Sequence, residues 1–259
     1  MRINDAHLHL FLPDRVIDIL QNSQYKNKYK LYNAINQSII LNPTNYVETI
    51  DNFFAIPIIF KEINIEEENK YVLETCDSLK KGIPVTLIDI NENFKGNYNY
   101  LIFKEHFLLH KFDEWKNRSL YYEYLNEKEG FLILHCKDNI RLEYINELLK
   151  NFPKMNIIVA HLGRDIYEDS NFIFNILDSL KFKDNVFFDI STINNFENIL
   201  TALNMISFKR IFYGSDYPYE FNFDSDCYKN KCLFKILKDS ELEAVMGENF
   251  ERIKKRIYK

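Results

Sequence analysis

The sequence predicts an α/β protein built as a somewhat distorted (β/α)8 barrel, with residues 1–259 forming a single domain. Three observations predict this fold class. The length of 259 residues suits one barrel domain, and the 46% hydrophobic content is enough for a large core. Short apolar runs also alternate with helix-length segments, which implies parallel strands covered by helices. An open doubly wound sheet is the alternative, but no glycine-rich phosphate loop follows the first run.

Eight apolar runs of strand length are candidates for the barrel strands. They cover residues 3–8, 38–41, 53–60, 101–105, 131–136, 157–161, 186–190 and 210–215. Each is short and nearly continuous in apolar character, as expected for a strand buried on both faces. The run 83–90 is a ninth candidate. The stretch 83–99 is therefore either an additional strand and loop, or a sign that the strands in the middle of the barrel are counted wrongly.

Five helices are expected between or after these strands. The first covers 114–129 and ends at Gly130, and the second covers 140–152 and ends before Pro153. Three more cover 170–180, 195–206 and 240–258. The last is expected to begin with a capping box at Ser240-Glu241-Leu242-Glu243.

Two histidines in the first strand indicate a metal site. His7 and His9 are two residues apart, so on a strand both imidazoles point to the same side and can bind one metal ion. His135 and His161 end two later strand candidates, and Asp216 stands where the last one finishes. The carboxyl ends of the strands are where barrel enzymes build their active sites. Imidazole and carboxylate groups are also the usual ligands of catalytic zinc.

Four motifs in order along the chain resemble the amidohydrolase superfamily. They are Asp5-Ala6-His7-Leu8-His9, Leu132-Ile133-Leu134-His135, Val159-Ala160-His161-Leu162-Gly163 and Tyr213-Gly214-Ser215-Asp216-Tyr217-Pro218. The closest similarity is to the amidohydrolase-related branch that includes the aminocarboxymuconate-semialdehyde decarboxylase type. The closing Met246-Gly247-Glu248-Asn249-Phe250 is also similar to the last helix of that branch. The resemblance covers nearly the whole chain and is weakest over 12–99.

The resemblance implies a divalent metal cofactor, with zinc preferred, one ion favoured and two ions the alternative. The implied ligands are His7, His9, His135 and Asp216. By the same resemblance, His161 corresponds to a residue that polarises water or substrate in one-metal relatives. In two-metal relatives that residue binds the second metal. Lys104, near the end of the fourth strand, corresponds to a bridging carbamylated lysine in some two-metal relatives. Otherwise it is a charge at the rim or a substrate contact.

The implied activity is that of a metal-dependent hydrolase of the amidohydrolase superfamily. A metal-activated water would attack an ester, lactone or amide of a small organic acid. Asp216 would shuttle the proton, and His161 would polarise the carbonyl or stabilise the oxyanion. Candidate substrate contacts surround these catalytic residues at the same rim: Lys104, His106, Arg164 and Tyr217.

Three other functions stay open at this point. The first is a metal-dependent non-oxidative decarboxylase that uses the same ligands. The second is a TatD-like DNase, which needs a glutamate at the end of the fourth strand, where Glu105 is a candidate. The third is a barrel that binds a metal or a small acid without turning it over.

The charge and hydropathy of the chain favour a small-molecule substrate as the partner. A carboxylate is one candidate for this substrate. The net charge of −5 argues against nucleic-acid binding, which needs a basic surface. No apolar run approaches the roughly 18 residues of a membrane helix, and the first residues do not read as a signal peptide. We therefore expect a cytoplasmic protein. The sequence leaves its oligomeric state open.

Overall fold

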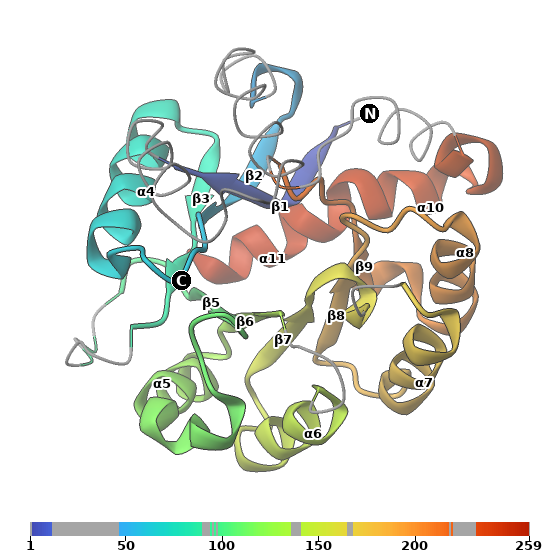
Figure 1. The fold of residues 1–259 in the computed structure, drawn as a ribbon. Helices are drawn as coiled ribbons and strands as arrows, with labels where there is room; N and C mark the ends of the chain where they lie inside the picture. The colour runs from blue at the N-terminus through green and yellow to red at the C-terminus, as the bar shows by residue number, and fades with distance from the viewer. Residues whose placement is uncertain are drawn as a thin grey trace.

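The computed structural model describes residues 2–11, 47–89, 94, 96, 98–135, 141–164, 168–217, 219 and 232–258. All strand pairings within these residues are parallel (Figure 1). One sheet contains β1 (Asn4–Leu10), β2 (Asn52–Pro57) and β3 (Gly82–Pro84). The second contains β4 (Thr86–Leu87), β5 (Ile102–His106), β6 (Phe131–His135), β7 (Asn156–Val159), β8 (Val186–Asp189) and β9 (Ile211–Phe212).

The two sheets are parts of one barrel. β3 and β4 are halves of a single barrel strand separated by Val85, whose N–H donates to the Ala55 carbonyl of β2 (2.9 Å). At the other seam, the His9 N–H of β1 donates to the Tyr217 carbonyl beyond β9 (2.7 Å). The described strands therefore fill eight positions in a ring, and the predicted (β/α)8 barrel is confirmed.

The middle of the barrel differs from the sequence-based expectation. The run 83–90 is not an additional strand, because residues 82–87 supply the third barrel strand. The candidate strand 38–41 lies outside the described residues, and the ring of eight is complete without it. The described residues between β4 and β5 contain no helix. The barrel is therefore distorted at this point, as expected.

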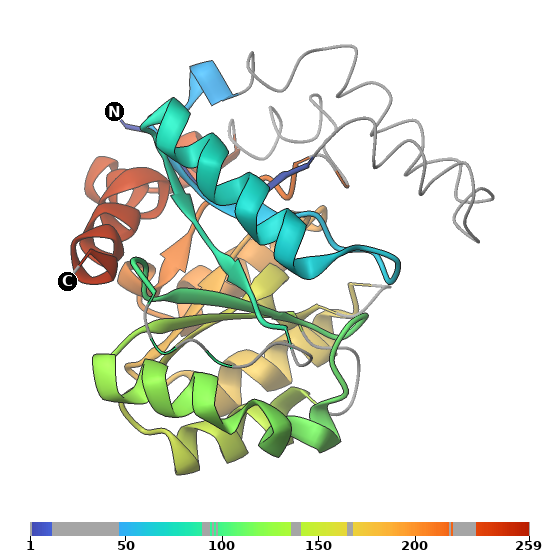
Figure 2. The same cartoon turned by 90° about the vertical axis from the view of Figure 1, so that its left-hand side faces the viewer.

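Helices surround the barrel and close one end of it (Figures 1 and 2). The predicted helix 114–129 is a 3-10 helix, η2 (Phe112–Arg118), followed by α5 (Ser119–Lys128). Three predicted helices are present as α6 (Arg141–Asn151), α7 (Ser170–Leu180) and α8 (Phe196–Met205). The C-terminal helix comprises α10 (Asp239–Glu243), the π-helical η6 (Ala244–Glu248) and α11 (Asn249–Ile257). None of the helices within the described ranges is both long and apolar enough to cross a membrane.

Two helix starts were not anticipated from the sequence. α4 (Ile65–Leu79) was not predicted, although Asn64 caps it by accepting a hydrogen bond from the Glu67 N–H (3.2 Å). The expected capping box at Ser240 is wrong. Instead, the Glu241 carboxylate accepts from the Lys238 N–H (3.0 Å), so the helix begins earlier than expected.

The interior of the barrel is apolar at one end and polar at the other. Inward side chains of the strands form a cluster with Phe250, Ile253 and Ile257 of α11, and Phe250 stacks on Phe54 with ring centroids 4.3 Å apart. α11 thus plugs the amino ends of the strands. Along β5 the inward positions change from the apolar Ile102 to Lys104 and His106 at the carboxyl end. This change of polarity leaves the opposite rim for a polar site.

Candidate active site

The two histidines of β1 both direct one ring nitrogen at Asp216. The Nδ1 of His7 donates to an Asp189 carboxylate oxygen (2.9 Å), and the Nδ1 of His9 donates to the Pro57 carbonyl (2.8 Å). Their Nε2 atoms lie 3.4 Å and 3.3 Å from the same Asp216 oxygen. Because both Nδ1 atoms carry the proton, both Nε2 atoms carry a lone pair of the kind that binds a metal.

Asp216 reaches the site through a left-handed backbone conformation, with φ of 59°. The turn before it is fixed by Asp5, whose carboxylate accepts from the Ser215 N–H (3.1 Å) and hydroxyl (2.6 Å). Asp5 also accepts from the His7 N–H (2.9 Å). One buried carboxylate therefore holds the first strand and the turn after the last strand together.

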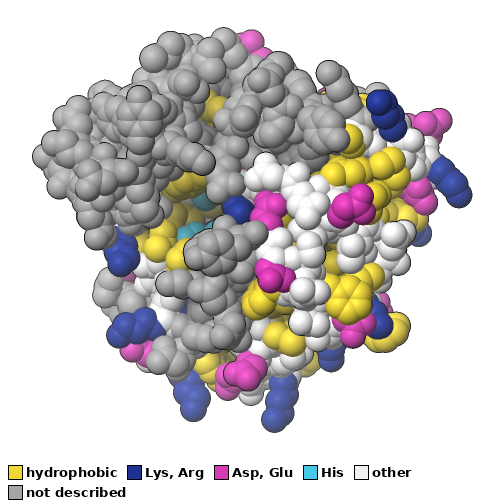
Figure 3. Space-filling model, turned by 45° about the vertical axis from the view of Figure 1, so that its right-hand side comes forward, with side chains coloured by type: hydrophobic (Ala, Val, Ile, Leu, Met, Phe, Trp, Pro, Cys, Tyr) yellow, Lys and Arg dark blue, Asp and Glu magenta, His cyan; other side chains and the backbone are white. Residues whose placement is uncertain are grey.

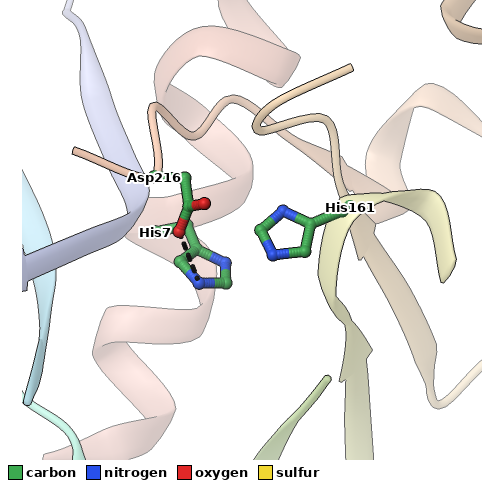
Figure 4. Close-up of side chains that lie close together, drawn as sticks. All are labelled: His7, His161 and Asp216. Carbon is green, nitrogen blue, oxygen red and sulfur yellow. Dashed lines mark ion pairs between the residues drawn. The ribbon is translucent and has the colours of Figure 1, made fainter. Parts of the chain in front are cut away.

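His161 enters the site in a way that strand periodicity does not predict. The expected strand 157–161 ends at Val159, and Ile158 rather than Val159 faces the barrel interior. His161 lies in a 3-10 turn, η4 (Ala160–Gly163), with φ of 55°, and Leu162 follows with φ of 51°. The turn, not the alternation of the strand, directs the imidazole at His7 and Asp216 (Figure 4).

Asp189, at the end of β8, joins two of these histidines. One of its oxygens accepts from the His7 Nδ1–H, and the other accepts from the N–H groups of His161 and Ser191 (3.1 Å each). The Ser191 hydroxyl also donates to this second oxygen and lies 2.8 Å from the His161 Nδ1. From the sequence, Asp189 was expected to end its strand, where a loop cap was an equal alternative, and its support of the site histidines was not predicted. Its position at a strand end, on the inward face, was the available signal.

Five imidazoles form a continuous arc around the rim. Their ring centroids are 5.3 Å apart for His9 and His7, 4.6 Å for His7 and His161, 4.6 Å for His161 and His135, and 4.4 Å for His135 and His106. The arc runs from β1 across η4 and β6 to β5. Histidine side chains are visible in a recess of the surface in Figure 3.

Lys104 lies inside this arc. It is fully buried on β5, and its Nζ is 3.2 Å from the Nε2 of His7. Lys104 thus contacts a candidate metal ligand directly. The side chain points into the barrel and is not a charge exposed at the rim, and the bridging and substrate-contact roles of Lys104 stay predictions.

The remaining candidate substrate contacts are placed unequally. Arg164 donates to the Thr192 hydroxyl (3.1 Å), which is itself 3.2 Å from the His161 Nδ1, so it lies beside the site. The Tyr217 side chain does not line the site. It packs in a separate hydrophobic cluster with outward-facing residues of β1 and β2. Tyr219 stands edge-on to His9 instead, with ring centroids 4.8 Å apart.

Glu105 faces away from the site and cannot supply the carboxylate that a DNase would need. On the outer side of β5 it forms a buried ion pair with Arg118 (2.8 Å) and accepts from the hydroxyls of Tyr122 (2.8 Å) and Tyr144 (2.9 Å). Strand alternation requires this, because the inward positions on either side of Glu105 belong to Lys104 and His106.

Burial sets the protonation states of the site. It lowers the pKa of the His161 imidazole to about 3, and it lowers the pKa values of His9, His106 and His135 as well. Burial alone would raise the pKa of the Asp216 carboxyl, but the imidazoles of His161 and His9 outweigh it and hold that pKa below its ordinary value. Neutral imidazoles and an ionised carboxylate are the forms that bind a divalent metal.

The donor set fits a divalent ion such as zinc. His7, His161 and Asp216 each offer one ligand atom, and these atoms all lie within 4.8 Å of one another. His9 adds a further nitrogen at the same carboxylate oxygen. Buried nitrogen and oxygen donors, held by hydrogen bonds on their far sides, are characteristic of zinc sites in enzymes.

Comparison with solved structures shows the same fold in enzymes with low sequence identity. A zinc-bound amidohydrolase of Burkholderia multivorans has a TM-score of 0.70 and 14% identity, with 98% of this chain and 99% of that chain covered. A Pseudomonas putida protein described as a candidate 2-pyrone-4,6-dicarboxylic acid hydrolase has a TM-score of 0.69 and 13% identity, covering 98% of both chains. The 5-carboxyvanillate decarboxylase of Sphingomonas paucimobilis has a TM-score of 0.66 and 12% identity, covering 97% and 98%. A search of curated proteins finds no match.

A family model described as amidohydrolase matches residues 91–253, which is more than half of the chain. The matched region contains His135, His161, Asp189 and Asp216, and the β1 histidines precede it. The barrel, the histidine arc and this match agree with the resemblance found in the sequence. The chain belongs to the amidohydrolase family and is a metal-dependent enzyme of the amidohydrolase superfamily.

Proposed function

We propose that the protein is a hydrolase that cleaves an ester, lactone or amide of a small organic acid. The observation that carries this proposal is the approach of the His7 and His9 Nε2 atoms to one Asp216 oxygen, with His161 beside them. A divalent ion bound there would act as a Lewis acid on a carbonyl oxygen and lower the pKa of a coordinated water to about 7.

We assign His7, His9, His135 and Asp216 to one metal ion, with zinc preferred. Asp216 has a second task, because its ionised carboxylate can accept a proton from the attacking water and pass it to the leaving group. His135, whose ring lies 4.6 Å from that of His161, is assigned as the fourth ligand on the resemblance to the family, and His161 is placed beside the ion although its ligand atom lies within 4.8 Å of those of His7 and Asp216.

The hydrogen bonds of His161 favour one of the roles that the resemblance implied, which is an interaction with water. Its Nδ1–H is directed at the Ser191 hydroxyl, whose own proton is donated to Asp189, so the Nε2 of the neutral ring carries a lone pair. A lone pair cannot donate a hydrogen bond to a carbonyl oxygen. We therefore propose that His161 orients the attacking water by accepting its hydrogen bond, and that Asp216 moves the proton.

Zinc content separates these assignments. We expect about one zinc per chain in the wild-type protein, loss of zinc in His135→Ala and retention in His161→Ala, measured by elemental analysis. His110→Ala is the matched control, because the His110 ring bonds to the backbone of His106 and Ile88. Two zinc ions per chain would overturn the single-metal assignment. Loss of zinc in His161→Ala with retention in His135→Ala would make His161 the ligand.

A non-oxidative decarboxylase is the second candidate, because the same barrel and ligand types would serve it and a decarboxylase is among the similar folds. The two reactions have different products. Hydrolysis in ¹⁸O-labelled water places label in the product acid, whereas decarboxylation releases carbon dioxide without that incorporation. Carbon dioxide release from an aromatic or enoic acid, with no hydrolysis of esters or lactones, would replace the proposed reaction.

A further inference from the structure

The hydrogen bonds of His106 fix where its ring carries a proton. The Leu108 N–H donates to the His106 Nδ1 (3.1 Å). A backbone N–H can only donate, so this Nδ1 is the acceptor and has no proton of its own. The neutral ring then has its proton on Nε2, which leaves His106 as a donor at that atom.

This tautomer is the opposite of the one found in His7, His9 and His161. In those three rings Nδ1 is the donor, to Asp189, Pro57 and Ser191 respectively, and Nε2 carries the lone pair. The histidines of β1 and η4 therefore face the site as acceptors or metal ligands. The histidine of β5 instead has its N–H donor at Nε2.

The His106 ring is also held in place on the strand. It is 7% exposed, stacks on Phe107 with ring centroids 4.5 Å apart, and stands edge-on to His135 at 4.4 Å. Its backbone N–H donates to the His110 Nδ1 (3.0 Å), and the His110 Nε2–H donates to the Ile88 carbonyl (2.9 Å). Turning the ring over would break the bond from Leu108, so the donor is preorganised.

Lys104 adds further donors on the same face of the strand. Positions 104 and 106 are two residues apart on β5, so both side chains point into the barrel. Lys104 is fully buried, and its side-chain nitrogen carries N–H donors whether or not it is charged. Two N–H donors on one strand face suit an anionic oxygen acceptor, for which carboxylate is the common biological case.

We propose that His106 is a substrate-binding residue and not a metal ligand, and that its Nε2–H donates to a carboxylate oxygen of the substrate beside Lys104. The inference rests on the proposed function only for the presence of a small organic acid. The tautomer of His106 is a property of the protein alone and can be tested without any reaction.

The first test is the tautomer itself. In ¹⁵N-histidine-labelled, zinc-loaded protein, two-bond ¹H–¹⁵N spectra distinguish the Nε2–H from the Nδ1–H form, and the signal that disappears in His106→Gln identifies the His106 ring. We expect Nε2–H for His106 and Nδ1–H for His7, His9 and His161. An Nδ1–H form of His106, or a metal-bound Nε2, would overturn the proposal.

The second test uses benzoate as a simple carboxylate probe. We expect His106→Leu to keep its zinc but to bind benzoate at least about tenfold more weakly than wild type, because a hydrogen bond to a charged group is lost. His106→Gln should recover most of the affinity, since its amide retains an N–H at a similar distance from the backbone. Equal binding to wild type and His106→Leu contradicts the donor role, and so does a wild-type protein that binds no benzoate.

These outcomes are separable from the proposed reaction. A protein that hydrolyses nothing in an ester and lactone screen, yet shows the expected tautomers and the expected loss of benzoate binding, retains His106 as the carboxylate donor. Only the hydrolase assignment would then fall.

Discussion

Replacing Asp189 with asparagine should weaken zinc binding without touching a metal ligand. The carboxylate accepts four hydrogen bonds: from the His7 Nδ1 (2.9 Å), from the N–H groups of His161 and Ser191 (3.1 Å each), and from the Ser191 hydroxyl. Three of these bonds converge on one oxygen, so the asparagine carbonyl is expected to take that place. The amide NH₂ must then face His7.

An amide NH₂ can only donate, so the His7 Nδ1 would have to become the acceptor. The proton of the neutral ring would move to Nε2, and His7 would lose the lone pair that binds metal. Loss of such a supporting carboxylate costs roughly 10–100-fold in metal affinity, or about 1.4–2.8 kcal/mol. We expect the Asp189→Asn protein to fall within this range, with the His9 tautomer unchanged.

The assay is competition for zinc against a chromophoric chelator, with the His7 tautomer read in the same variant by ¹⁵N NMR. Asp178→Asn is the matched control. Asp178 lies on α7, is about half exposed and pairs with Lys181 (2.6 Å). Asp189, in contrast, is fully buried beside the site histidines. Unchanged zinc affinity in Asp189→Asn would refute the reasoning, as would an unchanged His7 tautomer with weakened binding.

Three further perturbations test the fold around the site. Glu105→Gln leaves Arg118 as an uncompensated buried charge and should cost about 3–5 kcal/mol of unfolding free energy in a denaturant titration; a loss below about 1 kcal/mol would contradict this. Gly214→Ala would place a Cβ 3.0 Å from the Cβ of His7, so we expect a loss of about 1–3 kcal/mol and weaker zinc binding; wild-type values for both would show that the strand can yield. The folded pKa of His161 is about 3, below the ordinary 6.5, so the unfolded chain binds more protons between these values. Stability of the metal-free protein should therefore be full above about pH 6.5 and fall on acidification by up to about 1.4 kcal/mol per pH unit from this ring, with a shallower slope in His161→Asn.

The carboxyl-end rim could be predicted from the sequence because strand periodicity is local. Two residues per repeat place His7 with His9 and His135 with the inward residues of β6, whatever the rest of the chain does. The resemblance then supplied an order of motifs that matches the family. Strand periodicity did not predict how His161 is directed, because the strand ends at Val159 and His161 reaches the site through a left-handed turn.

The roles of individual rings could not be predicted, because they depend on partners far apart in the chain. Asp189 is 182 residues from His7 and 28 from His161, and no local pattern connects them. Likewise, Tyr217 and Glu105 looked like site residues by sequence position, yet both side chains pack outside the barrel.

The sequence by itself determined the fold class, the family and the inventory of histidines and carboxylates at the strand ends. Strand alternation and the spacing of the motifs are properties of the chain alone. Only the tertiary structure decided which nitrogen of each imidazole carries the proton. That choice is made by the group on the far side of the ring: Asp189 for His7, Pro57 for His9 and the Leu108 N–H for His106. Asp189 and Pro57 reach their rings only when the barrel has closed, whereas Leu108 is two residues from His106 and takes its place when the turn after β5 forms.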